Sequence, residues 1–281
     1  MIGLATDSTL PDLSGGEQLL FQELSTRTAC KIVIWDDPQE TWRGCSQIII
    51  RTTWDYSYHL PRFLNWIDQV ERAGIRLHNS ADILRWNCDK KYMLDLAERG
   101  VAIPETKWIP RGTLTPDLLA SLVSEPSVIK PTVSGGAKDT YRVSPENAHE
   151  VAEQLKEVAL VKDLMLQSFI PEIVNPGEYA LIYFRNEFSH AVLKTPAPGD
   201  YRVQARFGGQ TIAAEVAKSV IEQGRNILAQ IPFDDAPLYA RVDGILRKDQ
   251  FILMELELIE PYLFLEMGDG AERKLADTIL I

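Results

Sequence analysis

Short apolar runs alternate with amphipathic segments through the first 80 residues, and this alternation limits the fold more than any other feature. Strands are expected at 2–5, 31–35, 46–51 and 75–77, and helices at 16–27 and 60–73. Consecutive parallel strands need a crossover connection, usually a helix, so the pattern indicates a parallel sheet covered by helices. We therefore predict a doubly wound α/β domain over residues 1–80.

The rest of the chain divides into three further parts. Helices at 89–99 and 116–123 predict a linking helical segment over residues 81–124. A compact block over 125–171 indicates a small α/β lid, with strands at 127–130, 140–143 and 164–170 and a helix at 145–158. Strands at 178–184, 187–194, 238–247 and 250–258, with helices at 213–230 and 271–280, predict a mixed-sheet domain over residues 172–281.

Charge and cysteine content exclude several classes of protein. The chain has 29 Lys and Arg against 40 Asp and Glu, a net charge of −11, whereas nucleic-acid binding needs an excess of cations. The three cysteines form no CxxC pair, which favours a reducing, cytoplasmic location. No secretory leader and no run of about 18–20 apolar residues is found, so we expect neither export nor a membrane partner.

Acidic residues follow one another on two predicted strands near the C-terminus. Arg241 and Asp243 are two positions apart on one strand, as are Glu255 and Glu257 on the next, and residues at this spacing share a face. Crowded carboxylates repel one another unless a cation lies among them, and oxygen ligands suit Mg²⁺. A solvated hairpin face is the alternative, and for Arg241 it is a salt bridge to Asp243 or a neighbouring Glu.

A lysine at the end of a strand leads into a glycine-rich turn. Lys130 precedes the sequence that contains Ser134, Gly135 and Gly136, and free backbone N–H groups in such a turn can bind phosphates. The spacing fits neither a Walker A loop nor GxGxxG, and an ordinary turn is the alternative. Lys90 begins a helix from which it could also reach a phosphate, although a capped helix explains Asp89 and Lys90 equally well.

Polar residues also follow the third strand of the N-terminal domain. Ligands of open α/β sheets bind at the carboxyl ends of the strands. Arg51, Thr52, Trp54 and Asp55 could therefore bind a zwitterionic amino acid, with Arg51 on its carboxylate and Asp55 on its ammonium. The alternative is a capping turn in which Asp55 starts the next helix and Trp54 packs in the core.

The order of these motifs resembles that of the ATP-grasp superfamily of carboxylate ligases. The resemblance covers nearly the whole chain, and a branch that contains the O-ureido-serine cyclo-ligase of cycloserine biosynthesis looks similar in the runs RWNCDKKYMLDLAERGV, VIKPTVSGGAKDTYRV, MLQSFIPEI, GEYALIYFRNEFSHAVLKTPAPGDYRVQ and MELELIEP. The resemblance implies an ATP-grasp fold, ATP and one or two Mg²⁺ ions as cofactors, and a small amino-acid-like substrate. A homodimer is common among related ligases, and the sequence specifies no interface.

The resemblance also implies a role for each matching residue. Lys90, Lys130 and the turn at Ser134, Gly135 and Gly136 would contact the nucleotide; Gln167, Phe169 and Ile170 would recognise the adenine, and Glu178 the ribose. Asp243, Glu255 and Glu257 would hold Mg²⁺, although the family usually has Asn where this chain has Glu257, and the extra charge favours two ions.

The resemblance implies a catalytic part for the remaining cations. Arg241 and Arg202 would stabilise the transferring phosphoryl group and the tetrahedral intermediate, a task that suits the guanidinium fork. Lys194 should end its strand near the same cleft, where we expect it to contact the substrate. An exposed loop arginine is the alternative for Arg202.

A ligase that forms an acyl phosphate and condenses it with an amine is therefore the expected function. The condensation joins two parts of one molecule, as in a cyclo-ligase, or two amino acids, as in a peptide-type ligase. The same fold also serves carboxylation and kinase-like phosphoryl transfer, and a non-catalytic ATP-binding module would keep the same scaffold.

Overall fold

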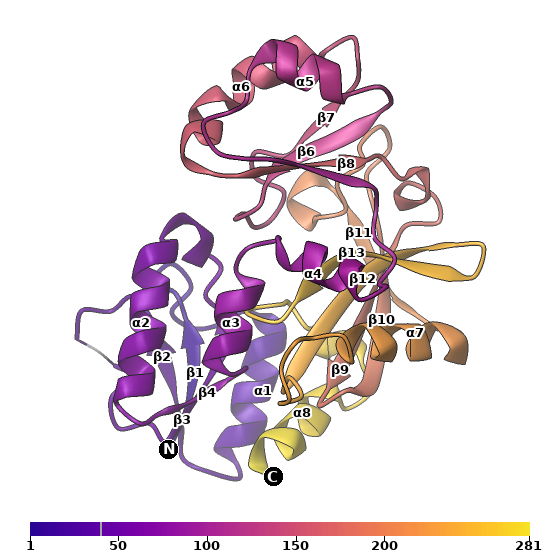
Figure 1. Ribbon diagram of the computed structural model, residues 1–281. Coiled ribbons are helices and arrows are strands. Elements are labelled where there is room, and N and C mark those ends of the chain that lie inside the picture. Colours follow the sequence, from indigo (N-terminus) through magenta and orange to yellow (C-terminus); the bar gives the residue numbers. More distant parts are fainter. Residues whose placement is uncertain (40) are drawn as a thin grey trace.

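The computed structural model describes residues 1–39 and 41–281, which form three sheets (Figure 1). The N-terminal domain contains a parallel sheet of order β2-β1-β3-β4, and its elements are β1 (Ile2–Thr6), α1 (Gly15–Ser25), β2 (Cys30–Ile34), β3 (Gln47–Thr52), η1 (Tyr56–Tyr58), α2 (Leu60–Arg72), β4 (Arg76–His78) and α3 (Ala81–Asn87). Successive residues of a strand point to opposite faces of this sheet. Leu4 packs in the hydrophobic cluster that includes residues of α1, and Ala5 packs in the cluster that includes residues of α2. The predicted doubly wound domain is confirmed.

The lid is an antiparallel sheet of order β5-β8-β6-β7 with two helices on it. Its elements are β5 (Thr106–Ile109), α5 (Pro116–Leu122), β6 (Ser127–Pro131), β7 (Tyr141–Val143), α6 (Ala148–Val161) and β8 (Leu164–Ser168), and α4 (Tyr92–Glu98) precedes them. The sequence predicts a linker up to residue 124, but β5 pairs with β8 and Leu119 of α5 packs with Leu155 of α6. The lid sheet therefore begins at β5, earlier than the predicted boundary.

The C-terminal domain is a sheet of order β11-β10-β9-β12-β13 in which every neighbouring pair is antiparallel, not mixed as expected. Its elements are η2 (Pro171–Ile173), β9 (Glu178–Phe184), β10 (Glu187–Thr195), η3 (Ala205–Phe207), β11 (Gln210–Ala214), α7 (Lys218–Leu228), β12 (Tyr239–Arg247), β13 (Gln250–Glu257), η4 (Leu265–Met267) and α8 (Ala271–Leu280). The helix expected from residue 213 begins at Lys218, because Gln210–Ala214 pairs with β10 as an edge strand. Helix α8 packs beside α1 and joins the first and last domains (Figure 1).

Buried hydrogen bonds connect the N-terminal and C-terminal domains behind the lid. The Asn79 amide donates to the carbonyl oxygens of Tyr239 and Leu258, and its oxygen accepts from the backbone N–H of Leu238. The Tyr239 hydroxyl lies 2.7 Å from the Ile50 carbonyl oxygen. Buried polar groups that are fully paired specify one packing arrangement, so these contacts fix how the two domains meet.

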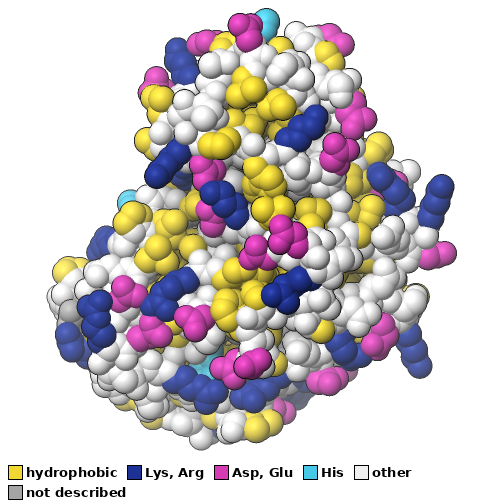
Figure 2. Space-filling view, in the orientation of Figure 1, with side chains coloured by type: hydrophobic (Ala, Val, Ile, Leu, Met, Phe, Trp, Pro, Cys, Tyr) yellow, Lys and Arg dark blue, Asp and Glu magenta, His cyan; other side chains and the backbone are white. Residues whose placement is uncertain are grey.

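Figure 2 shows basic and acidic side chains interspersed over the face in view. Within residues 1–39 and 41–281, no helix combines the length and apolar character that crossing a membrane requires.

Candidate active site

A cleft of about 970 Å³ lies where the lid faces the other two domains. It is lined by all the site residues that the sequence predicts except Arg51 and Thr52: Trp54, Asp55, Lys90, Lys130, Ser134, Gly135, Gly136, Gln167, Phe169, Ile170, Glu178, Lys194, Arg202, Arg241, Asp243, Glu255 and Glu257. The fold thus brings together, in one cavity, residues that are spread over about two hundred positions of the chain.

The charged floor of the cleft is built by strands β12 and β13. Their register places Arg241 opposite Glu257 and Asp243 opposite Glu255, with an irregularity directly after Asp243. The Asp243 carboxylate accepts hydrogen bonds from Arg241 Nε at 3.0 Å and from Lys194 Nζ at 2.7 Å. Arg241 also pairs with Glu257. The expected shared face is confirmed, and so is the salt bridge of Arg241.

Burial and ion pairing act in opposite directions on the carboxyl pKa values. Burial raises the pKa of Asp243, but Arg241 and Lys194 outweigh it and hold this pKa below its usual range. Burial raises the pKa of Glu257 to about 7, and Arg241 offsets only part of this effect. Burial also raises the pKa of Glu178, whose carboxylate lies 2.5 Å from Lys194 Nζ. Asp243 is therefore held in its charged form, and so is Glu255, because Lys90 and Lys130 lower its pKa against the effect of burial.

Two lysines approach the floor from other elements. Lys90 Nζ lies 3.2 Å from Glu255 Oε1 and 2.5 Å from the Ser134 carbonyl oxygen, so it connects the floor to the glycine-rich turn. Lys130 is the residue before the last in β6, and burial lowers its pKa, although Glu255 opposes this shift. Asn87, at the end of α3, helps to position Lys90 three residues later. Its side chain donates a hydrogen bond to the Leu256 carbonyl oxygen in β13 and accepts one from the Leu258 N–H directly after this strand.

The glycine-rich turn contacts both neighbouring domains. Gly136 has φ +57°, and a Cβ there would lie 3.3 Å from the Arg206 guanidinium, so a side chain would be strained and crowded at this position. Lys138 Nζ lies 4.2 Å from the centre of the Tyr58 ring, across the cleft. The turn therefore forms one edge of the opening to the cleft.

Aromatic and amide side chains form the end of the cleft under the lid. Phe169 packs between the Arg142 guanidinium, 4.2 Å from its ring centre, and Tyr201, whose ring centre is 6.1 Å away. Gln167 Nε2 donates to Thr106 Oγ1 at 3.2 Å. Sequence reasoning missed Tyr201 and Arg142, and only the preference of arginine for aromatic faces could have suggested the second of these.

Two of the residues that the sequence predicts to bind the substrate, Arg51 and Thr52, do not line the cleft. Arg51 is fully buried, and its Nε and Nη2 donate to the two oxygens of Glu17 at 2.7 and 2.8 Å. Thr52 is also buried and donates to Thr6 Oγ1. Arg51 thus contacts α1 and Thr52 contacts β1, and neither residue lines the cleft.

Trp54 and Asp55 do line the cleft. Trp54 is 41% exposed, its indole N–H donates to the Glu260 carbonyl oxygen at 3.1 Å, and its ring centre lies 6.3 Å from that of Tyr262. Asp55 accepts a hydrogen bond from Trp35 Nε1 at 2.8 Å. Sequence reasoning missed Glu260, although it lies three positions beyond Glu257; burial and the charge of Glu257 raise the pKa of its carboxyl group well above the ordinary value.

Arg202 lies in the loop after β10 and lines the same cleft. Its guanidinium donates to both oxygens of Asp200 and lies 3.7 Å from the centre of the Phe207 ring. The predicted alternative of an exposed loop arginine is wrong, because this side chain is partly buried and held from two sides.

The donor set suits Mg²⁺ by its chemistry. Asp243 and Glu255 present carboxylate oxygens from opposite positions of neighbouring strands, and oxygen ligands are those that Mg²⁺ prefers. Within the described part of the chain, no three His, Cys, Asp or Glu side chains converge closely enough to hold a metal ion among them. The floor therefore offers a pair of carboxylates on which substrate phosphates could complete a metal site, which is the usual way Mg²⁺ is bound.

Comparisons with known proteins agree on the fold. Residues 2–79 match the family described as the N-terminal domain of D-cycloserine synthetase DcsG. Over 270 residues the chain is 29% identical to the cycloserine biosynthesis protein DcsG of Streptomyces lavendulae, an alignment that covers 87% of this chain and 86% of that protein. The crystal structure of D-cycloserine synthetase DcsG superimposes with a TM-score of 0.88 at 23% identity, covering 99% of this chain and 98% of that one.

More distant structures share the same architecture. D-alanine–D-alanine ligase from Bacillus anthracis, complexed with ATP, gives a TM-score of 0.69 at 17% identity and covers 99% of this chain and 95% of that one. The ATP-grasp ligase PsnB, complexed with minimal precursor, Mg and ADP, gives 0.64 at 15% identity and covers 99% and 97%. The chain is thus a homologue of DcsG and has the fold of the ATP-grasp ligases.

Proposed function

We propose that this protein is an ATP- and Mg²⁺-dependent ligase that acts on a small amino-acid-like substrate. One observation carries the proposal: carboxylates and cations alternate over the floor of a single cleft, beneath a lid with a glycine-rich turn. The similarity to a cycloserine biosynthesis protein supports a small amino-acid-like substrate, and we propose that the condensation joins two parts of one molecule. D-alanine–D-alanine ligase has the same fold, so joining two amino acids is the alternative.

The proposed nucleotide site occupies the lid side of the cleft. Gln167, Phe169 and Ile170 would hold the adenine, and Glu178 the ribose once it exchanges its contact with Lys194. Lys90, Lys130 and the turn at Ser134, Gly135 and Gly136 would hold the phosphates. Lys130 is partly buried, and burial lowers its pKa although Glu255 and Glu178 act in the opposite direction, so an anionic phosphate beside it would favour its charged form.

We propose that Asp243 and Glu255 hold Mg²⁺ together with oxygens of the bound phosphates, and that Glu257, which pairs with Arg241 in this structure, completes the ligand set when the ion binds. A bound Mg²⁺ ion supplies positive charge that neutralises the β- and γ-phosphate oxygens. The pKa of about 7 of the Glu257 carboxyl group means that this residue can give up a proton near neutral pH when a cation approaches. Arg241, which pairs with both Asp243 and Glu257, fixes the positions of these oxygens.

The proposed chemistry has two steps. An oxygen of the substrate carboxylate attacks the γ-phosphorus, the bond to the β-phosphate oxygen breaks, and ADP leaves with that electron pair. An amine then attacks the acyl carbon, loses a proton, and phosphate departs with the electrons of its C–O bond. Arg241 and Arg202 would stabilise the negative charge that develops in each step. Trp54 and Asp55 would position the substrate, with Asp55 on its ammonium group.

Release of phosphate and ADP across a panel of small amino acids tests this proposal. The compounds are offered singly and in pairs with ATP and Mg²⁺, and O-ureido-D-serine is included. Stimulation by a single compound would indicate cyclisation, and stimulation only by a pair would indicate intermolecular ligation. Stoichiometric transfer of the phosphoryl group to a stable acceptor, without free phosphate, would contradict the ligase assignment in favour of a kinase.

Nucleotide is expected to protect the glycine-rich turn from proteolysis. Lys138 follows this turn and packs on Tyr58, so a nucleotide that holds the lid closed should slow tryptic cleavage after Lys138 on the order of tenfold. Cleavage after Lys248, in the exposed turn between β12 and β13, is the internal control and should not change. Equal cleavage after Lys138 with and without a non-hydrolysable ATP analogue would contradict closure over the nucleotide.

A further inference from the structure

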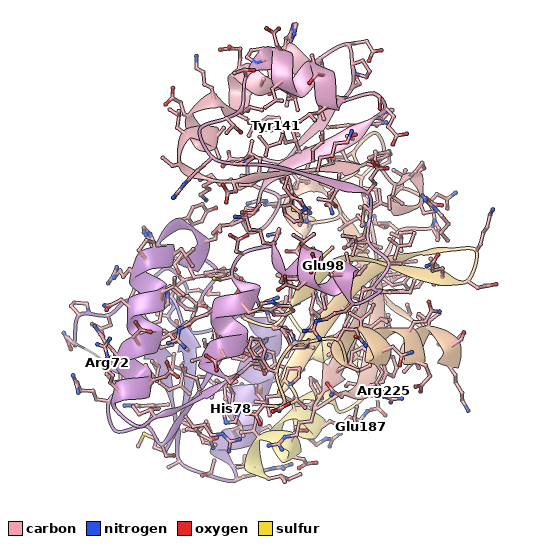
Figure 3. All side chains as sticks on the ribbon, in the orientation of Figure 1. Arg72, His78, Glu98, Tyr141, Glu187 and Arg225 are labelled. Atoms are coloured by element: carbon pink, nitrogen blue, oxygen red, sulfur yellow. The ribbon has the colours of Figure 1, made fainter. Side chains whose placement is uncertain are left out.

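A second cavity, of about 410 Å³, lies on the side of the molecule away from the lid. It shares no lining residue with the large cleft. It lies where strand β4 of the N-terminal domain meets the turn between β9 and β10 and the segment before β12. Figure 3 shows His78 at this junction, far from Tyr141 on the lid. The proposed ligase chemistry uses none of the residues that line it.

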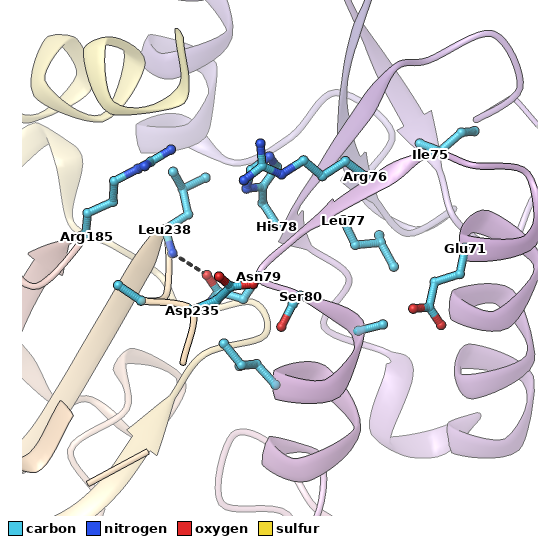
Figure 4. A pocket seen from close by; sticks show the side chains of 13 residues that line it. Glu71, Ile75, Arg76, Leu77, His78, Asn79, Ser80, Arg185, Asp235 and Leu238 are labelled. Carbon is cyan, nitrogen blue, oxygen red and sulfur yellow. Dashed lines mark hydrogen bonds between the residues drawn. The ribbon is translucent and has the colours of Figure 1, made fainter. Parts of the chain in front are cut away.

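Two arginines from different domains converge on this cavity. Arg76 begins β4 and Arg185 lies in the tight turn after β9, and Figure 4 shows their guanidinium groups pointing toward one another with His78 beside them. Burial, together with the charges of Arg76 and Arg185, lowers the pKa of His78 to about 4.

Neither guanidinium is neutralised within the described part of the chain. No hydrogen bond or ion pair joins the side chain of Arg76 or Arg185 to another described residue. Two carboxylates also line the cavity: Glu71 is paired with Arg85, and Asp235 is not within ion-pair distance of either arginine. Both arginines are exposed, and they place two positive charges at the same cavity in a protein whose net charge is −11.

The backbone holds the start of the Arg185 side chain in place. Arg185 has φ +46° at the first position of the two-residue hairpin turn between β9 and β10, and Lys248 has a similar φ in the turn between β12 and β13, as this type of turn requires. The Arg185 N–H donates to the Leu238 carbonyl oxygen, which fixes the start of the side chain at the rim of the cavity.

We propose that Arg76 and Arg185 together bind a phosphate dianion in this cavity, either as inorganic phosphate or as the phosphate group of a small monoester. Guanidinium forks match the several acceptor oxygens of phosphate, and two of them balance its two charges. The cavity is larger than a phosphate ion, and Ile75, Leu77 and Leu238 provide an apolar wall for the body of a monoester. The bound anion would connect the N-terminal domain to the hairpin of the C-terminal domain.

Calorimetric titration of the full chain with sodium phosphate tests this site. The large cleft is first saturated with Mg²⁺ and a non-hydrolysable ATP analogue, and ionic strength is matched with sodium chloride. We expect wild-type protein to bind phosphate, and Arg76→Gln and Arg185→Gln each to weaken this binding at least about tenfold, since each removes a charge-assisted pair of hydrogen bonds. Arg72→Gln, an exposed charge on α2 outside the cavity, is the matched control and should bind like wild type.

Thermal unfolding provides the second readout. Phosphate should raise the Tm of wild type and of Arg72→Gln but not of Arg185→Gln, because a ligand that binds only the folded chain stabilises it. Titration with glycerol 3-phosphate decides whether the site binds a monoester or inorganic phosphate. Tighter binding of glycerol 3-phosphate than of inorganic phosphate supports a monoester, and equal or weaker binding supports the free ion. Failure of wild type to bind phosphate, equal affinity in all four proteins, or tighter binding of succinate would each overturn the proposal. None of these outcomes depends on ligase activity.

Discussion

Replacing Glu255 by Gln is expected to lower ATP-dependent phosphate release by between about a hundredfold and a thousandfold. Glu255 lies opposite Asp243 on the cleft floor and pairs with Lys90. The substitution removes a negative charge from the proposed Mg²⁺ ligands without changing the size of the side chain, and loss of one preorganised electrostatic contact to a transition state costs roughly that factor. Steady-state phosphate release, measured against Mg²⁺ concentration at saturating ATP, checks it.

The matched control is Glu172→Gln. Glu172 pairs with Arg247 near the opposite end of β12, so this variant makes the same chemical change outside the cleft. It should retain full activity. An active Glu255→Gln enzyme with an unchanged Mg²⁺ dependence would show that Glu255 does not hold the metal.

Asp243→Asn should be equally inactive, but it is a less informative variant. The Asp243 side chain is nearly fully buried between Lys194 and Arg241, whereas that of Glu255 is 33% exposed. Removing a buried carboxylate leaves its cations unpaired and destabilises the fold as well as the site. Loss of activity in Asp243→Asn therefore needs an unfolding measurement beside it, which Glu255→Gln needs less.

The parts of the fold that the sequence predicts well are those with local periodicity. Strands β1 and β3 are continuous apolar runs, as expected for strands buried on both faces, and α2 has helical spacing of its apolar residues. Sequence reasoning missed strand β5, because TKWI is only four residues long and its partner β8 lies more than fifty residues away. The prediction of a helix from residue 213 overlaps the end of strand β11, since an exposed edge strand has no apolar run to mark it.

Site residues could be predicted from the sequence where the order of the motifs along the chain determines where a residue lies in the fold. They could not be predicted where a side chain can turn toward either of two neighbouring elements. Lys90 lies in the turn between α3 and α4, Lys130 near the end of β6 and Asp243 within β12, and all three line the cleft as expected. Arg51 also follows an apolar strand, so its sequence context is the same whether it turns to the cleft or to α1. Only the buried position of Glu17 on α1 decides between these, and no local pattern near Arg51 encodes it.

Replacing Glu17 by Gln is expected to lower the free energy of unfolding by about 3 to 5 kcal/mol. Glu17 and Arg51 form a bidentate pair with side chains that are 1% and 0% exposed, and Arg51 also donates to the Pro261 carbonyl oxygen at 2.7 Å. The substitution leaves a buried guanidinium without a counter-charge, which costs this much in buried ion pairs. Urea denaturation measures the change. Glu153→Gln, which breaks the exposed pair with Lys156, is the control and should cost less than about 1 kcal/mol.

The same pair decides what Arg51 contributes to function. A residue that binds the substrate carboxylate would, when replaced by Met, raise the KM for the amino-acid substrate and leave unfolding nearly unchanged. The geometry predicts the reverse, because Arg51 stacks 4.5 Å from the centre of the Tyr239 ring and joins α1 to the segment after β13, behind the cleft. Combining Arg51→Met with Glu17→Leu should then recover much of the lost stability, since an apolar pair can replace a buried ion pair without loss. A raised KM in the stable double variant would instead place Arg51 in contact with the substrate.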